Sequence, residues 1–181
     1  MKIREDLIVN SEQHPYADSL KEKLMTEAFD IESSGFENAK FTNIVGTKLT
    51  VDNSLNAPSK IIGNWVTNIM RNAYFNADVQ KMSYRSTLWF AKYNKDDYTR
   101  PHSHRPSYKS FVYFVKSPKG SSPLVFTNTR KKIQPVEGIV VVFDGGIKHH
   151  VPPNKCEDRV VLAGNIVTYY NTLTKDVYRL V

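Results

Sequence analysis

The fold is decided by residues 138–154, GIVVVFDGGIKHHVPPN, in which a Val-rich run is followed by a glycine turn and a pair of histidines. A short run of β-branched and aromatic residues between glycines is typical of a buried β-strand. The run from Ile139 to Phe143 is the longest strongly apolar segment of the chain, and it is far too short to cross a bilayer. We therefore expect a buried strand that ends in a tight turn just before His149 and His150.

Segments of the same kind lie on both sides of this stretch. They are rich in Val, Phe, Tyr, Trp and Thr, are separated by Pro, Gly, Asn and Asp, and cover residues 86–93, 108–116, 123–128, 133–136, 138–143 and 159–170. Many short strands with tight turns, and no helix long enough to cross between parallel strands, predict an antiparallel sandwich or barrel. The expected fold class is α+β, mainly β, with a jelly roll as its main part.

The first third of the chain is predicted to be helical. Apolar residues recur at helical spacing over residues 19–29, and a second helix is expected from Ser59, as its N-cap, to about Tyr74. Residues 40–51 between them have a strand-like mixture of Thr, Val and Ile. We expect the helices to pack on an outer sheet face. The chain has no internal repeat and no Gly/Ser linker, so residues 1–181 are predicted to form a single domain, with a helical part over about 1–80 and a jelly-roll core over about 84–181.

Composition and charge exclude several classes of protein. A chain with 40% hydrophobic and 12% aromatic residues can fill a core, which excludes a disordered chain. The single Cys156 excludes an intramolecular disulfide and a four-cysteine zinc site, so we expect a cytoplasmic protein. The net charge is +7, but the basic residues are scattered. A solvated turn explains the one tight cluster, Arg130-Lys131-Lys132, as well as a phosphate contact does. Nucleic acid is therefore an improbable partner, and no membrane association is expected.

Four of the five histidines form two groups, His102-Ser103-His104 and His149-His150. A His-x-His on an extended segment directs both imidazoles to the same side, where they can share a cation. In a small barrel, strands that lie far apart in the sequence readily become neighbours, which can bring the second group to the first. Two ligands from one edge and one from another would form a facial triad with open positions. A polar surface loop and a satisfied core histidine are the alternatives that these residues leave open.

The order of these features resembles a known family, the Fe(II)- and 2-oxoglutarate-dependent oxygenases of the double-stranded β-helix fold. The stretches that resemble it most are WFAKYNKDDYTRPHSHRPSYKSFVYFVKSPKGSSPLVF, EGIVVVFDGGIKHHVPPN and EDRVVLAGNI, which together span about residues 85–168. The chain looks most like the small prolyl-hydroxylase-like members found in tailed bacteriophages. The resemblance implies a dioxygenase that acts as a hydroxylase and uses Fe(II), 2-oxoglutarate and dioxygen, in the host cytoplasm if a phage encodes it.

By this resemblance the metal ligands are His102, His104 and His149. The distal pattern of the family, His-x-Val-x-Pro-Asn, fits His149, Val151, Pro153 and Asn154, so His149 is chosen over His150. If the strand is regular, His150 points to the opposite face of the sheet.

The resemblance also implies residues that hold 2-oxoglutarate. Arg159 corresponds to the basic residue that binds the distal carboxylate, because a guanidinium binds a carboxylate bidentately. Asn165 shares the strand face of Arg159 and is expected to line the same pocket. Tyr113 corresponds to a strand aromatic that contributes a hydroxyl to the co-substrate, with core packing as its equally weighted alternative.

One position departs from the wider superfamily, because His104 stands where most members carry Asp or Glu. Three neutral imidazoles leave a metal more positive than two imidazoles and a carboxylate do. Asp97 on the preceding loop is the alternative source of a carboxylate. The rival functions are a cupin-type metalloprotein and a non-enzymatic jelly-roll protein of a virion or a binding surface. The primary substrate, a peptide or a small molecule, is not specified by the sequence.

Overall fold

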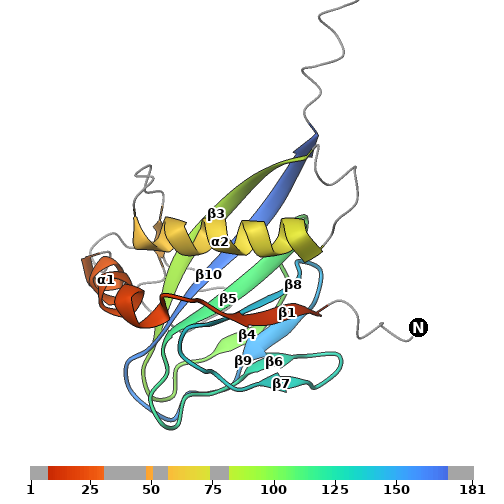
Figure 1. Ribbon diagram of the computed structural model, residues 1–181. Coiled ribbons are helices and arrows are strands. Elements are labelled where there is room, and N and C mark those ends of the chain that lie inside the picture. Colours follow the sequence, from red (N-terminus) through yellow and green to blue (C-terminus); the bar gives the residue numbers. More distant parts are fainter. Residues whose placement is uncertain (1–7, 31–47, 51–56, 74–81, 171–181) are drawn as a thin grey trace, which may run out of the picture.

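The strands of this protein form two antiparallel sheets that face each other (Figure 1). The structure is a computed structural model, and it describes residues 8–30, 48–50, 57–73 and 82–170. The larger sheet contains, in spatial order, β1 (Ile8–Gln13), β8 (Ile139–Asp144), β5 (Lys109–Lys116), β10 (Arg159–Tyr170), β3 (Met82–Tyr93) and β2 (Lys48–Thr50). The smaller sheet contains β4 (Thr99–His102), β9 (His149–Val151), β6 (Leu124–Phe126) and β7 (Lys132–Ile133). This architecture is mainly β and jelly-roll-like, as expected.

Side chains of the larger sheet contribute to two hydrophobic cores, one on each face of the sheet. The inner core lies between the sheets and includes Val112 and Phe114 of β5, together with Leu124 and Phe126 of β6. The helix-side core lies on the other face of the larger sheet. It includes the alternate residues of β5, among them Phe111 and Tyr113. Seven of the eight residues of β5 are buried because both faces of this strand are covered.

Two helices cover the outer face of the larger sheet (Figure 1). Helix α1 (Ala17–Asp30) and helix α2 (Pro58–Ala73) match the predicted helices within a few residues. Helix α2 buries an apolar stripe at helical spacing, formed by Ile62, Val66, Ile69 and Met70. Neither described helix is both long and apolar enough to span a bilayer.

The predicted cap of the second helix is wrong. Helix α2 begins one residue earlier, at Pro58, and the carbonyl of Ala57 accepts hydrogen bonds from the backbone N–H groups of Lys60 and Ile61. The Glu27 carboxylate of α1 accepts hydrogen bonds from the backbone N–H and the hydroxyl of Ser59. A side chain of the neighbouring helix therefore accepts a hydrogen bond from a backbone N–H group in the first turn of α2. A contact between two helices of this kind cannot be predicted from the local sequence.

The first third of the chain is less helical than predicted. Strand β1 lies outside any predicted strand and pairs with β8 at the edge of the larger sheet, opposite the Val-rich run. Strand β2 falls inside the strand-like residues 40–51 and pairs with β3, whereas residues 40–47 and 51 lie outside the described residues. The remaining predicted strands are present, with β10 at its predicted bounds and β7 displaced by one to three residues from the predicted 133–136.

Candidate functional site

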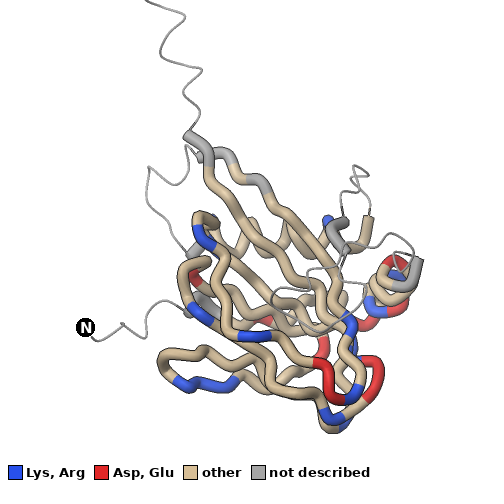
Figure 2. The backbone as a smooth tube through the Cα atoms, turned by 180° about the vertical axis from the view of Figure 1, so that it is seen from behind, with Lys and Arg blue, Asp and Glu red and all other residues tan. Residues whose placement is uncertain are grey.

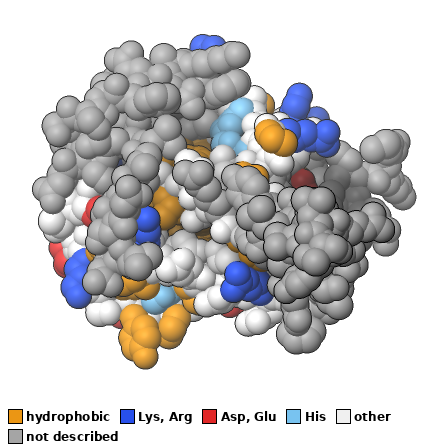
Figure 3. All heavy atoms as spheres, turned by 90° about the horizontal axis from the view of Figure 1, so that it is seen from above, with side chains coloured by type: hydrophobic (Ala, Val, Ile, Leu, Met, Phe, Trp, Pro, Cys, Tyr) orange, Lys and Arg blue, Asp and Glu red, His pale blue; other side chains and the backbone are white. Residues whose placement is uncertain are grey.

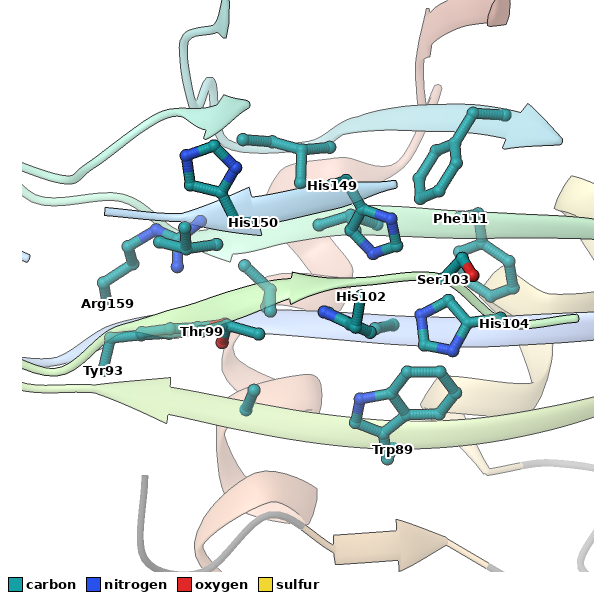
Figure 4. A pocket seen from close by; sticks show the side chains of 17 residues that line it. Trp89, Tyr93, Thr99, His102, Ser103, His104, Phe111, His149, His150 and Arg159 are labelled. Carbon is teal, nitrogen blue, oxygen red and sulfur yellow. The ribbon is translucent and has the colours of Figure 1, made fainter. Parts of the chain in front are cut away.

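The structure brings His102, His104 and His149 together at one end of the space between the sheets. Their ring centroids are 4.8 Å apart for His102 and His104, 4.4 Å for His102 and His149, and 5.1 Å for His104 and His149. Their potential ligand nitrogens all lie within 4.8 Å of one another. The three rings point toward one another in Figure 4, whereas the ring of His150 points away. One cation can therefore lie between the three rings with little side-chain movement.

Backbone pairing accounts for this convergence. Strand β4 is antiparallel to β9, and His102 lies directly opposite His149. His104 follows the end of β4, where its backbone N–H donates a 2.7 Å hydrogen bond to the carbonyl of Gly145 in the turn after β8. A β-carbon at Gly145 would collide with the backbone of Ser107, so the close approach of these two loops requires glycine here.

Hydrogen bonds to backbone carbonyls set the protonation of two of the rings. Nδ1 of His102 lies 2.8 Å from the carbonyl oxygen of Arg100, and Nδ1 of His149 lies 3.0 Å from that of Ile147. Because a carbonyl oxygen only accepts, each Nδ1 carries the proton and each Nε2 is the unprotonated ring nitrogen. This is the arrangement of a metal-binding imidazole supported by an outer partner.

The three imidazoles are neutral near pH 7. Burial lowers the pKa of His149 to about 3 and the pKa of His104 to about 4, and neighbouring imidazoles add to both shifts. Burial also lowers the pKa of His102. Since only the neutral ring can donate a lone pair, burial prepares all three side chains for a metal.

A cavity of about 160 Å³ extends from the histidines to Arg159. Its other lining residues are mostly apolar or aromatic, and none of the described lining residues is acidic. The cavity is smaller than the pockets that hold drug-sized ligands, so it suits a small molecule. Figure 4 shows His102, His104 and His149 toward one end and Arg159 with Tyr93 at the other.

Arg159 is a buried cation with free hydrogen-bonding capacity. The residue is 1% exposed, and its Nε and Nη1 atoms have no hydrogen-bond partner among the described residues. Its guanidinium carbon lies 4.4 Å from the ring centroid of Tyr93, whose hydroxyl is 2.8 Å from that of Thr99. Burial lowers the pKa of Arg159, although a guanidinium keeps its charge in proteins. An unpaired buried charge is costly, so this end of the cavity is suited to an anion.

Two of the predicted co-substrate residues do not line this cavity. Tyr113 lies on the opposite face of β5, in the helix-side core, with its ring centroid 6.5 Å from that of Trp65. The prediction of a co-substrate contact there is wrong, because the side chain of Tyr113 points toward the helices, and core packing is its role. Asn165 does share the strand face of Arg159, but its side-chain oxygen accepts a 2.8 Å hydrogen bond from Ser110, beyond the cavity.

Two further candidates have local partners. The Asp97 carboxylate accepts a 2.7 Å hydrogen bond from the backbone N–H of Asn94 and lies outside the histidine cluster. Nδ1 of His150 lies 3.0 Å from the hydroxyl of Thr127. Neither Asp97 nor His150 is therefore placed to bind the same cation as His102, His104 and His149.

The sequence interpretation missed residues at the Arg159 end. Neither Tyr93 nor Thr99 was predicted as a site residue, yet both line the cavity beside Arg159. Tyr93 lies directly opposite Arg159 in the pairing of β3 with β10, and this register would have identified Tyr93 as a site residue.

The fold of this chain is similar to that of several solved structures. The chain is similar to a prolyl-4-hydroxylase from Pseudomonas putida, with 20% identity, a TM-score of 0.68 and coverage of 87% of this chain and 91% of that chain. It is also similar to a viral collagen prolyl hydroxylase from Paramecium bursaria Chlorella virus-1 in a 2-oxoglutarate complex, with 15% identity, a TM-score of 0.66 and coverage of 86% and 94%.

A third similar structure is a prolyl hydroxylase from Trichoplax adhaerens in complex with a peptide fragment of hypoxia inducible factor, with 14% identity and a TM-score of 0.63 over 86% of this chain and 82% of that one. No family model matches the sequence, and no curated protein matches it. Similarity at this level of identity concerns the fold. The chain has the fold of the prolyl hydroxylases and of the wider group of 2-oxoglutarate- and Fe(II)-dependent oxygenases.

Proposed function

We propose that this protein is an Fe(II)- and 2-oxoglutarate-dependent dioxygenase that hydroxylates its substrate. The observation that carries the proposal is one small cavity with three neutral, convergent imidazoles at one end and a buried, unpaired guanidinium at the other. The fold shared with the prolyl hydroxylases supports the same function.

The donor set fits Fe(II). Imidazole nitrogen is a ligand that suits iron, and three ligands on one side of a cation leave positions open for other molecules. His102, His104 and His149 would hold the metal, with the carbonyls of Arg100 and Ile147 fixing two of the rings.

The other end of the cavity fits a carboxylate. The free Nε and Nη1 donors of Arg159 would bind the distal carboxylate of 2-oxoglutarate, and the mostly apolar walls would enclose its carbon chain. The aromatic face of Tyr93 fixes the orientation of the guanidinium. The proximal end of the same molecule would then face the three histidines.

The chemistry that Fe(II) and 2-oxoglutarate supply when bound is oxidation of a C–H bond by dioxygen, with conversion of 2-oxoglutarate to succinate and carbon dioxide. The protein contributes position and a dry environment. The inner core below the histidines, with Phe143 packed edge-on against His149 at 4.7 Å, excludes water from the reacting groups.

The substrate and the compartment are part of the proposal. A similar structure contains a peptide, so we infer that the substrate of this protein is a protein segment. A single cysteine and chemistry that needs Fe(II) suit a reducing compartment, and we infer the cytoplasm.

The test is succinate formation by the purified protein. In air, with Fe(II) and 2-oxoglutarate, slow succinate release is expected without any added substrate, and it should disappear without Fe(II) or without oxygen. His102→Ala should abolish it, whereas Lys23→Ala, on the exposed side of α1, should leave it unchanged. Succinate release that is independent of Fe(II), or none at all from protein that binds the metal, would contradict the proposal.

A further inference from the structure

The two ends of the space between the sheets differ in exposure. His102, Ser103 and His104 are partly exposed, whereas Arg159 at the opposite end is 1% exposed. The Arg159 end, which we call the closed end and where Tyr93 is also buried, is therefore the more buried end of the cavity, and the histidine end is the more exposed one. A substrate too large to enter the cavity must approach from the histidine end.

Three loops converge at this more exposed end. They follow β4, β6 and β8, and backbone hydrogen bonds join them: His104 N–H donates to the Gly145 carbonyl and Thr127 N–H donates to the Lys148 carbonyl, at 2.7 and 2.9 Å. The loops and the adjoining strands carry six exposed basic side chains, which we call the basic rim: Arg100, Arg105, Arg130, Lys131, Lys132 and Lys148. Figure 3 shows histidine side chains on this side of the molecule with Lys and Arg side chains beside them.

Among the described residues, no acidic side chain forms an ion pair with the basic rim. Residues 98–107, 117–136 and 145–156 contain no Asp or Glu. Within the described part of the chain, the ion pairs involve Lys21, Lys92, Lys109 and Lys116, and no rim residue takes part in one. The carboxylate of Asp144, at the end of β8, lies 3.8 Å from the ammonium of Lys109 and accepts a hydrogen bond from the backbone N–H of Gly146.

Acidic residues lie instead at the closed end. The loops after β3 and β9 contain Asp96, Asp97, Glu157 and Asp158. Figure 2 shows these loops with red segments, whereas the hairpin of β6 and β7 has a blue turn and no red segment. A net charge of +7 spread over the whole surface would not produce this separation. The positive potential is concentrated around the one end through which a substrate can reach the histidines.

We propose that the substrate of this site is an acidic protein segment that docks on the basic rim; this inference rests on the proposed function. Exposed Lys and Arg side chains attract a flexible acidic chain at long range and fix its direction across the opening. Single-stranded nucleic acid also carries negative charge, but proteins bind it with aromatic side chains on which bases stack. Among the described residues of the three loops, no aromatic side chain is exposed, so the surface favours a peptide.

The test measures binding of defined probes to the full chain by fluorescence anisotropy. The probes are a labelled peptide of alternating Glu and Pro, the corresponding peptides with Ser or Lys in place of Glu, and single-stranded oligodeoxythymidylate. The Glu peptide should bind, with an affinity that falls as salt is added, and the Ser and Lys peptides should bind at least about tenfold more weakly.

Double variants that each remove two positive charges show which surface binds the peptide. Lys131→Ser with Lys132→Ser removes two charges of the basic rim and should weaken binding of the Glu peptide about tenfold. Arg100→Ser with Arg105→Ser should have a similar effect. Lys23→Ser with Lys60→Ser removes two charges from the helices and should leave the affinity unchanged. Equal effects of the rim and helix pairs, or tighter binding of the oligodeoxythymidylate than of the Glu peptide, would overturn the inference.

Binding of Mn(II) and 2-oxoglutarate to the same wild-type preparation separates the two proposals. A protein that binds both small ligands but does not prefer the Glu peptide would retain the proposed function and lose the acidic substrate. A protein that binds neither ligand would lose the proposed function itself, whatever peptide it binds.

Discussion

His102 of strand β4 lies directly opposite His149 of strand β9, and the centroids of their imidazole rings are 4.4 Å apart. The two side chains come from distant parts of the sequence, and one antiparallel strand pair holds both. Each ring is also oriented by a carbonyl two residues before it, that of Arg100 for His102 and that of Ile147 for His149. The pairing of two short strands therefore places two oriented imidazoles at once, and His104 needs only the following turn to join them.

The first prediction concerns the choice between adjacent histidines. His149→Ala should abolish binding of Mn(II), used as a stand-in for Fe(II), because it removes one of three convergent nitrogens. His150→Ala should retain most of the affinity, because the ring of His150 contacts Thr127. Calorimetric titration of both variants measures this difference. An equal loss in the two variants would reverse the assignment.

The second prediction is that a substitution at Arg159 weakens 2-oxoglutarate binding but stabilises the fold. Arg159→Met keeps much of the side-chain volume but removes the donors, so 2-oxoglutarate should bind about a hundredfold more weakly in the presence of Mn(II). The ligand-free variant should unfold at a higher urea concentration than the wild type, because an uncompensated buried charge has been removed. Unchanged 2-oxoglutarate affinity, or a loss of stability together with the loss of affinity, would contradict the role of a buried charge that awaits an anion.

The third prediction concerns pH. The pKa values of His149 and His104 are lowered to about 3 and about 4, below the ordinary value of 6.5, so the unfolded chain binds more protons than the folded one at acidic pH. Their contribution to stability is complete above pH 6.5 and is lost as the pH falls toward 4. Urea unfolding of metal-free protein at pH 7 and pH 5 measures the effect. His149→Gln should show a smaller difference between the two pH values, and an equal difference would show that other groups cause it.

The fourth prediction concerns the asparagine that ends the distal histidine motif. Asn154 is buried, and its side chain accepts a 2.9 Å hydrogen bond from the N–H of Ser122 and donates one of 2.7 Å to the carbonyl of Cys156. Its backbone is also hydrogen-bonded to the loop after β3. Asn154→Ala should lower the free energy of unfolding by about 2 kcal/mol, because it leaves buried backbone groups unpaired. Asn128→Ala, at an exposed turn position, is the control and should have no measurable effect.

The sequence predicted the histidine cluster well and the walls of the cavity poorly. The cluster could be recognised because histidines are few and their spacing is distinctive. Strand β5, by contrast, is buried on both faces, so its residues do not alternate between apolar and polar, and the sequence does not show which of them face inward. For this reason the sequence left a co-substrate contact and core packing as equal alternatives for Tyr113.

Strand β1 was missed for a related reason. Its sequence, IVNSEQ, has no clear alternation, and the strand forms because it pairs with the edge of β8. Contacts of this kind depend on the whole fold and leave no local pattern. The start of α2 on the Glu27 carboxylate is another example, since Ser59 has the residue type of a cap but lies inside the helix.

The proposed function requires one site that holds a metal and 2-oxoglutarate together. No described acidic residue lines the cavity, so no protein carboxylate there compensates a divalent cation at the histidines or the guanidinium of Arg159. The 2-oxoglutarate dianion supplies that negative charge. Calorimetric titration of 2-oxoglutarate into anaerobic protein, with and without one equivalent of Mn(II), measures this coupling. We predict one 2-oxoglutarate per chain, bound at least about a hundredfold more tightly when the metal is present. The same affinity with and without Mn(II) would contradict a shared site.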